Sequence, residues 1–190
     1  KKISAGFQHS LFLSSAGEVY GCGKSDKYQL GEEYLKAYNE AKSFKDFGMG
    51  VRKIKLNNIQ LHENIIEAKA GKYHSVFLTG KFLIILDQGN VYAMGINRFG
   101  QLGHSNLNLA KTSDPIKLEF QKSVKIVKLE CGDNHNLMLA DDGTIYSNGD
   151  NSVGQVDGNL ENFLYYNCTP KQIELPYKSK VIKIMAKNNR

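Results

Sequence analysis

The feature that most constrains this chain is a 15-residue pattern that occurs three times. Its copies are GEVYGCGKSDKYQLG at 17–31, GNVYAMGINRFGQLG at 89–103 and GTIYSNGDNSVGQVD at 143–157. In each copy an aromatic residue follows the first glycine by three positions, a second glycine follows by six, and a glutamine follows by twelve. Such fixed spacing is typical of repeat proteins, in which each unit buries its faces against its neighbours.

A second shared block precedes each copy of this pattern. It consists of Gly-x-x-His and an apolar run, and reads AGFQHSLFL at 5–13, AGKYHSVFL at 70–78 and CGDNHNLML at 131–139. Its glycines, Gly6, Gly71 and Gly132, are 65 and 61 residues apart. That interval is too long for a helical solenoid, and it suits a propeller blade of about four short strands.

The sequence therefore predicts an all-β fold, a partial β-propeller of about three blades that occupies residues 1–190. The repeat units are expected at approximately 1–64, 65–125 and 126–180, with the start of a fourth at 181–190. Because the first residues align within a strand of the later copies, the chain is expected to be part of a longer one. Each unit should contain a hairpin and an outer strand; the outer strands are expected at Val51–Leu56, Pro115–Leu118 and Pro170–Leu175.

Two segments depart from the repeat. Residues 32–47, EEYLKAYNEAKSFKDF, contain good helix formers with an apolar residue at every third position. They predict a short helical insertion that carries Leu35 and Tyr38 on its apolar face and ends at Gly48 and Gly50. Phe82–Leu86 is an apolar insertion in the second hairpin, which either extends the hairpin or marks a contact surface.

Composition says little about partners. The net charge is +6, but it arises from 22 lysines and only 3 arginines, scattered along the chain. Because arginine is preferred for planar phosphate and base recognition, this is weak support for specific nucleic-acid binding, and nonspecific attraction to DNA or acidic proteins stays open. No apolar run reaches the length of a membrane helix, so no membrane partner is expected. The three cysteines lack metal-ligand spacing and are interpreted as small buried residues of an intracellular, reducing compartment.

The recurring polar residues have structural interpretations. Ligands to one metal ion must converge, whereas equivalent histidines on successive blades lie far apart, so no metal site is predicted. Each histidine is instead expected to be buried and bonded to the backbone of a neighbouring strand, and each glutamine is expected to brace its loop. The glycine before each histidine needs either a positive φ or close backbone approach. These residues are His9, His74, His135, Gln29, Gln101, Gln155, Gly6, Gly71 and Gly132.

The sequence carries no sign of covalent catalysis. The segment GINRFGQLG lacks the Lys-Ser/Thr pair of a phosphate-binding loop and opens no helix. Neither a Ser/His/Asp arrangement nor a pair of carboxylates recurs between the copies. No cofactor is therefore predicted.

Taken together, the two blocks resemble the repeat of the regulator of chromosome condensation family. The resemblance covers nearly the whole chain outside the insertions, and it implies part of a seven-bladed propeller whose remaining blades are a partner. The founding member is a nucleotide-exchange factor for the GTPase Ran and binds chromatin. The resemblance thus implies guanine nucleotide exchange by loop insertion without covalent chemistry, a Ran-type GTPase as partner, possible histone or DNA binding, and a nuclear or cytoplasmic location.

The resemblance also implies where a partner would bind. In the family, the two residues between glycine and histidine lie in turns on the GTPase-facing side. Asp133 attracts most interest because an acidic Gly-Asp-x-His turn resembles one used in exchange; its alternative is an ordinary turn-forming aspartate. The competing function is that of an interaction scaffold inside a larger protein such as a ubiquitin ligase, a kinase or a ciliary complex. The candidate residues are Phe7, Gln8, Lys72, Tyr73, Asp133 and Asn134.

Overall fold

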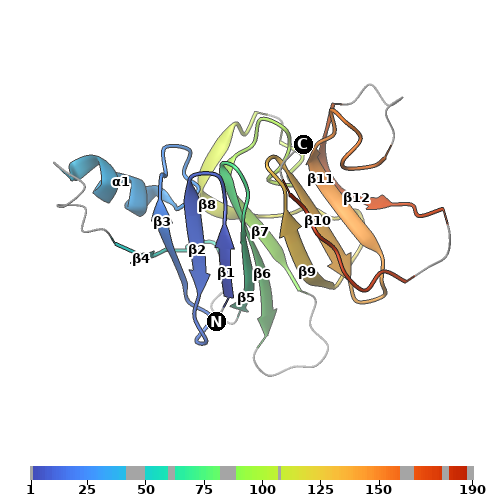
Figure 1. Cartoon of the computed structure of the whole chain (residues 1–190), viewed down its shortest axis with the longest axis horizontal. Coiled ribbons are helices and arrows are strands. Elements are labelled where there is room, and N and C mark those ends of the chain that lie inside the picture. Colours follow the sequence, from blue (N-terminus) through green and yellow to red (C-terminus); the bar gives the residue numbers. More distant parts are fainter. Residues whose placement is uncertain are drawn as a thin grey trace.

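The computed structural model describes residues 2–41, 50–59, 63–81, 89–106, 108–158, 165–176 and 180–187. They form three four-stranded antiparallel sheets and one short helix, and Figure 1 shows the sheets side by side as successive blades. The expected all-β partial propeller is confirmed. The first blade contains β1 (Lys2–Ala5), β2 (His9–Leu13), β3 (Val19–Gly23), α1 (Glu32–Glu40) and β4 (Arg52–Lys53); the second β5 (Glu63–Ala70), β6 (His74–Lys81), β7 (Val91–Ile96) and β8 (Lys111–Lys117); the third β9 (Ile126–Cys131), β10 (His135–Ala140), β11 (Ile145–Asp150) and β12 (Tyr166–Ile173).

Strand order within each blade follows the sequence, so the first strand is innermost and the fourth is the outer edge. The inner strands β1, β5 and β9 are in contact across the blades. Glu67 on β5 is buried, accepts the Leu129 N–H of β9 at 2.8 Å and pairs with Lys2 Nζ of β1 at 3.4 Å. One carboxylate therefore connects all three blades.

Two apolar cores lie between the blades, one on each face of the second sheet. Along β6, Phe77 packs against the first blade, whereas Val76 and Leu78 pack against the third. All three side chains are completely buried. A strand covered on both faces needs an unbroken apolar run, which explains the sequence VFL at 76–78.

The outer strands differ from the expected ranges. β4 covers only Arg52–Lys53, whereas β8 and β12 begin four residues before their expected starts, at Lys111 and Tyr166. Residues 111–114, KTSD, are polar and give no alternating pattern, so their strand is fixed by pairing with β7, where Thr112 lies opposite Gly95. Tertiary pairing outweighs local pattern at a sheet edge.

The helical insertion is shorter than expected. α1 ends at Glu40, where Ala41 turns to an extended conformation with φ −69° and ψ 121°; residues 42–49, including the expected stop at Gly48, lie outside the described residues. The buried face is also different, because Tyr34 is its fully buried residue and Leu35 is only half-buried. The three-residue period used for the expected face drifts around a helix, whereas Tyr34, Ala37 and Tyr38 follow its true period and contact the first core.

The last described segment, 180–187, contains no strand but follows the path of the earlier inner strands. The Val181 N–H donates to Gly143 O at 3.4 Å, just as Ile65 passes beside Gly17 and Ile126 beside Gly89. The apolar insertion Phe82–Leu86 lies outside the described residues. Within the described part of the chain, no helix has the length and apolar character that crossing a membrane requires.

Candidate partner-binding rim

The turns before β2, β6 and β10 line up along one edge of the molecule. They comprise Gly6–His9, Gly71–His74 and Gly132–His135, and together they are called the turn rim. In each, the glycine N–H donates to the histidine carbonyl at 2.8–2.9 Å. Neighbouring turns are also bonded to each other, because Phe7 N donates to Gly71 O at 3.4 Å and Lys72 N donates to Asp133 O at 2.8 Å. The turn rim is therefore a continuous backbone structure across three blades.

An aromatic and cationic cluster occupies the first half of the turn rim. Phe7 is 60% exposed, and its ring meets the ring of Tyr73 edge-on at a centroid distance of 6.0 Å. Lys72 Nζ lies 5.2 Å from the Phe7 centroid and 5.9 Å from that of Tyr73. The two blades thus present an exposed aromatic pair with an ammonium group held beside it, a combination suited to protein recognition.

Asp133 and Asn134 occupy the third turn, and both are partly exposed. The Asp133 backbone is used, since its carbonyl accepts the Lys72 N–H, but its carboxylate has no ion pair or hydrogen bond to any other described residue. Gln8 is exposed in the first turn. The structure therefore gathers all six predicted partner residues on the turn rim, with one carboxylate available to a partner.

The first two turns are anchored from below by their histidines, and the anchor is different from the one expected. His9 Nε2 lies 3.0 Å from Ser75 Oγ, and His74 Nε2 lies 2.8 Å from Asn136 Oδ1. Ser75 and Asn136 are the residues that directly follow the histidine of the next blade. The partner of these two imidazoles is therefore a side chain of the neighbouring blade, whereas the sequence predicted backbone.

The glutamine loop of the same blade meets this anchor. Ser75 Oγ donates to Gln29 O at 2.6 Å, and Asn136 Nδ2 donates to Gln101 O at 2.7 Å. The glutamine side chains act within their own loops: the Oε1 atoms of Gln29, Gln101 and Gln155 accept the N–H groups of Lys27, Phe99 and Val153. One polar residue of the next blade thus connects the turn rim to the glutamine loop.

These contacts fix the protonation state of the histidines. Asn136 Oδ1 can only accept, and Ser75 Oγ already donates to Gln29 O, so the Nε2 of each imidazole carries the hydrogen. The Nδ1 atoms of His9 and His74 are buried with no hydrogen-bond partner. A second proton would have no acceptor there, and burial lowers the pKa of His9 to about 3 and that of His74 to about 4.

The glycines allow this packing by their lack of a side chain. A Cβ on Gly71 would lie 2.0 Å from Cε1 of His74, and one on Gly132 would lie 2.1 Å from Cε1 of His135. Neither glycine has a positive φ, so of the two expected reasons close approach applies and the left-handed conformation does not. At the second glycine of each unit the reason differs: Gly95 has φ 112° and faces Tyr73 O.

The described residues offer no chemistry for a metal ion. No group of three histidine, cysteine, aspartate or glutamate side chains among them is close enough to bind one. Sequence reasoning missed Ser75 and Asn136 as anchoring residues. The sequence did carry a signal, because each is a polar residue that directly precedes an apolar run. The structure shows that both side chains are fully buried.

Three meander blades with glycine-histidine turns define a β-propeller built from chromosome-condensation-type repeats. Residues 88–139 match the model of the regulator of chromosome condensation (RCC1) repeat, and residues 1–29 and 126–155 match a second model of the same repeat. The chain belongs to the RCC1 family.

Curated relatives are much longer than this chain. The X-linked retinitis pigmentosa GTPase regulator of Mus musculus is 37% identical over 101 residues, 53% of this chain and 9% of that protein. Protein RCC2 homolog of Danio rerio is 30% identical over 80% of this chain and 26% of that protein. The probable E3 ubiquitin-protein ligase HERC6 of Homo sapiens is 31% identical over 90% of this chain and 14% of that protein.

Solved structures share the fold. Human WBSCR16 aligns with a TM-score of 0.75 at 22% identity, over 99% of this chain and 44% of that one. Yeast RCC1 (Prp20) bound to Kap60 aligns with a TM-score of 0.73 at 22% identity, over 98% of this chain and 39% of that one. The chain spans less than half of either structure.

Proposed function

We propose that this chain belongs to a guanine nucleotide exchange factor for a Ran-type small GTPase and that the turn rim is its GTPase-binding surface. The observation that supports this most is the continuous turn rim itself. It joins an exposed aromatic pair, a lysine and the unpaired carboxylate of Asp133, and it is rigidly anchored by buried histidines. Exchange requires only that such a surface bind the nucleotide-free GTPase more tightly than the nucleotide-bound form.

Relatives of the same fold support the choice of partner. Prp20p from Saccharomyces cerevisiae, whose crystal structure was described together with its binding properties to Gsp1p and histones, aligns with a TM-score of 0.72. Its 22% identity carries the fold and leaves the partner of this chain as a proposal. A nuclear location and contact with histones or DNA belong to the same proposal, and the net charge of +6 is compatible with the acidic surface of DNA.

The test is the release of a fluorescent guanine nucleotide from purified Ran, followed by stopped flow with and without this chain. Acceleration of release that saturates with chain concentration supports the proposal. A GTPase of another family serves as control and should release nucleotide at its intrinsic rate. No acceleration of either GTPase rejects the exchange function.

An interaction scaffold is the second candidate, and a specific observation favours it. Matches to the GTPase regulator and to HERC6 cover only 9% and 14% of those proteins, so comparable repeats occur as small parts of much larger chains. A scaffold would bind a partner through the turn rim and leave nucleotide release unchanged. Binding of Ran measured by calorimetry, beside an unchanged release rate, would select this function.

A further inference from the structure

Tyr28 holds a backbone conformation that its side chain disfavours. Its φ is 64°, and among the described residues it is the only one other than glycine with a positive φ. The equivalent positions in the other two copies of the 15-residue pattern are Gly100 and Gly154, with φ 72° and 76°. The loop therefore requires a left-handed residue at this point, and glycine would adopt that conformation without the steric cost that tyrosine incurs.

Contacts inside the protein do not account for the tyrosine. Gly100 permits close packing, because a Cβ there would lie 2.6 Å from Cys168 Cα of β12. Tyr28 instead extends its side chain toward β8, the fourth strand of the next blade, where Lys111 Nζ lies 4.5 Å from the ring centroid. Lys111 is exposed and Tyr28 is half-buried. Because an exposed cation–π pair stabilises a fold by less than a left-handed tyrosine costs, this contact alone does not explain the residue.

The loop that carries Tyr28 lies on the same side of the molecule as the turn rim. At its start, Lys24 N donates to Gln8 O of the first turn at 2.7 Å. At its end, the carbonyl of Gln29 accepts from Ser75 Oγ at 2.6 Å, directly after the second turn. Tyr28 is therefore held beside the first two turns of the rim.

Lys111 is connected to the same side independently. It lies opposite Ile96 in the pairing of β7 with β8, and Ile96 N donates to Tyr73 O at 3.0 Å. The Tyr28–Lys111 pair thus lies next to Tyr73, on the side away from the inner strands. Like the contact of Phe7 with Tyr73, it crosses from the first blade to the second.

We infer that Tyr28 is a partner-contact residue, which extends the turn rim outward along the seam between the first two blades and takes part in recognition of the GTPase. The inference rests on the proposed function for the identity of that partner. Strained residues persist where function requires their side chains, and tyrosine is enriched among the residues that dominate protein–protein binding. Lys111 is then a positioning residue, because its ammonium group holds the ring at the seam.

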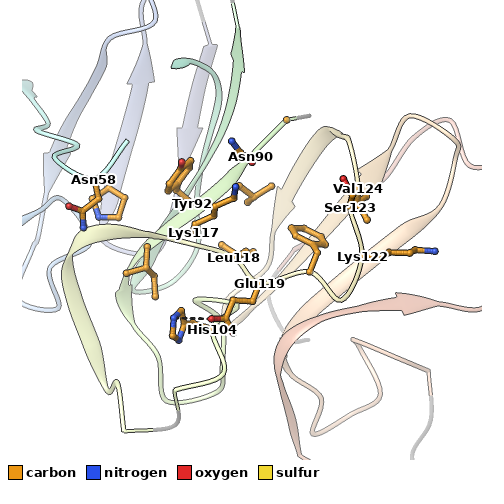
Figure 2. A pocket seen from close by; sticks show the side chains of 15 residues that line it. Asn58, Asn90, Tyr92, His104, Lys117, Leu118, Glu119, Lys122, Ser123 and Val124 are labelled. Atoms are coloured by element: carbon orange, nitrogen blue, oxygen red, sulfur yellow. Dashed lines mark ion pairs between the residues drawn. The ribbon is translucent and has the colours of Figure 1, made fainter. Parts of the chain in front are cut away.

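The opposite end of β8 provides a matched control. Lys111 begins this strand and Lys117 ends it. Lys117 is exposed and lines a cleft of about 780 Å³ beside the second blade, which Figure 2 shows. It pairs with Tyr92, far along β7 from Ile96, so its replacement makes the same charge change away from the turn rim.

The test is the binding of nucleotide-free Ran to the full chain, measured by isothermal titration calorimetry beside thermal melting of each variant. Tyr28→Gly should weaken binding at least about tenfold yet melt no lower than the wild type, because glycine removes the strain. Tyr28→Asn tolerates the left-handed conformation and should behave in the same way. Tyr28→Phe keeps the ring and should bind within about threefold of the wild type. Lys111→Met should weaken binding about threefold, and Lys117→Met should change it less than about twofold.

Two results would overturn the inference. Equal binding of Ran by the wild type and Tyr28→Gly would make Tyr28 a filler of the seam between the blades. No binding of Ran by the wild type would remove the inference and the proposed function together. Stopped-flow nucleotide release separates the two claims. A wild type that binds Ran without accelerating release rejects the exchange function, whereas weaker binding by Tyr28→Gly in that same case still supports the contact.

Discussion

His74 Nε2 lies 2.8 Å from Asn136 Oδ1, across the interface between the second and third blades. The same Asn136 donates its amide to Gln101 O, so the turn rim and the glutamine loop of the second blade share one contact in the third. His9 and Gln29 meet Ser75 in the same arrangement one blade earlier. The repeated histidine is therefore a connector between blades, and this role leads to the first predictions.

Replacing His74 by alanine should destabilise the fold, because the imidazole has a structural role and takes no direct part in binding a partner. The change removes a fully buried ring and one acceptor contact of Asn136, which should lower the free energy of unfolding by about 1–3 kcal/mol. Urea unfolding followed by circular dichroism measures this value. His104→Ala, at a histidine whose side chain is 30% exposed, is the matched control and should cost much less. Equal costs in the two variants would contradict the connector role.

Acid should unfold the protein through these histidines. The folded pKa values of His9 and His74, about 3 and about 4, lie below the usual 6.5, so the neutral rings stabilise the fold fully above pH 6.5. That stability is lost as the pH falls from 6.5 toward 4, because only the unfolded chain takes up the protons. Each histidine should contribute a loss of about 1.4 kcal/mol per pH unit in this window.

Unfolding titrations at several pH values between 6 and 5 measure that slope. The variant His74→Gln lacks one titrating group, so its slope in this window should be smaller than that of the wild type by about 1.4 kcal/mol per pH unit. The same slope in both proteins would show that His74 does not carry the acid sensitivity.

Gly71→Ala should be far more harmful than an ordinary glycine substitution. The new Cβ would lie 2.0 Å from the His74 ring and must displace it, at a cost of about 1–3 kcal/mol for overpacking. Gly80→Ala is the control on the same hairpin, since its Cβ would meet only the side chain of Ile66 at 3.2 Å or more. Thermal melting should separate the two variants clearly, and identical melting temperatures would disprove the close-packing role of Gly71.

The blade architecture could be predicted from the sequence because the same motifs recur at fixed spacing. Strands that are buried on both faces, such as β6, add a recognisable apolar run. The anchoring partners could not be read in the same way. Ser75 lies 66 residues from His9, and Asn136 lies 62 residues from His74, so their contacts depend on how blades stack. The helix was predicted, but its early end and the early starts of β8 and β12 were missed because pairing and burial, which local pattern does not contain, fix those boundaries.

The candidate site was likewise predictable from the sequence only in part. The resemblance placed Phe7, Lys72 and Asp133 in equivalent turns, and the structure brings these turns together. The stacking of Lys72 beside two rings depends on the distance between blades and had no signal in the sequence. Asp133 had two interpretations from the sequence, and its unpaired carboxylate keeps the partner-binding one available for testing.

Lys72 should act on the rate of encounter with an acidic partner. Lys72→Gln removes the charge beside Phe7 and Tyr73 and should slow association about two- to fivefold at low salt, with little effect at high salt. Lys128→Gln, at an exposed lysine away from the turn rim, should change association much less. Surface plasmon resonance over a range of salt concentrations measures both. An effect of Lys72→Gln that persists unchanged in high salt would exclude steering as its role.

The most direct measurement is stopped-flow release of fluorescent nucleotide from Ran with wild type and Asp133→Ala at matched concentrations. Because Asp133 has no internal ion pair, its loss should change stability by no more than about 0.5 kcal/mol. The proposed exchange function predicts that the wild-type chain accelerates release and that Asp133→Ala is at least about tenfold slower, equivalent to about 1.4 kcal/mol. Equal acceleration by both proteins would remove Asp133 from the site, and no acceleration by the wild type would contradict the exchange function itself.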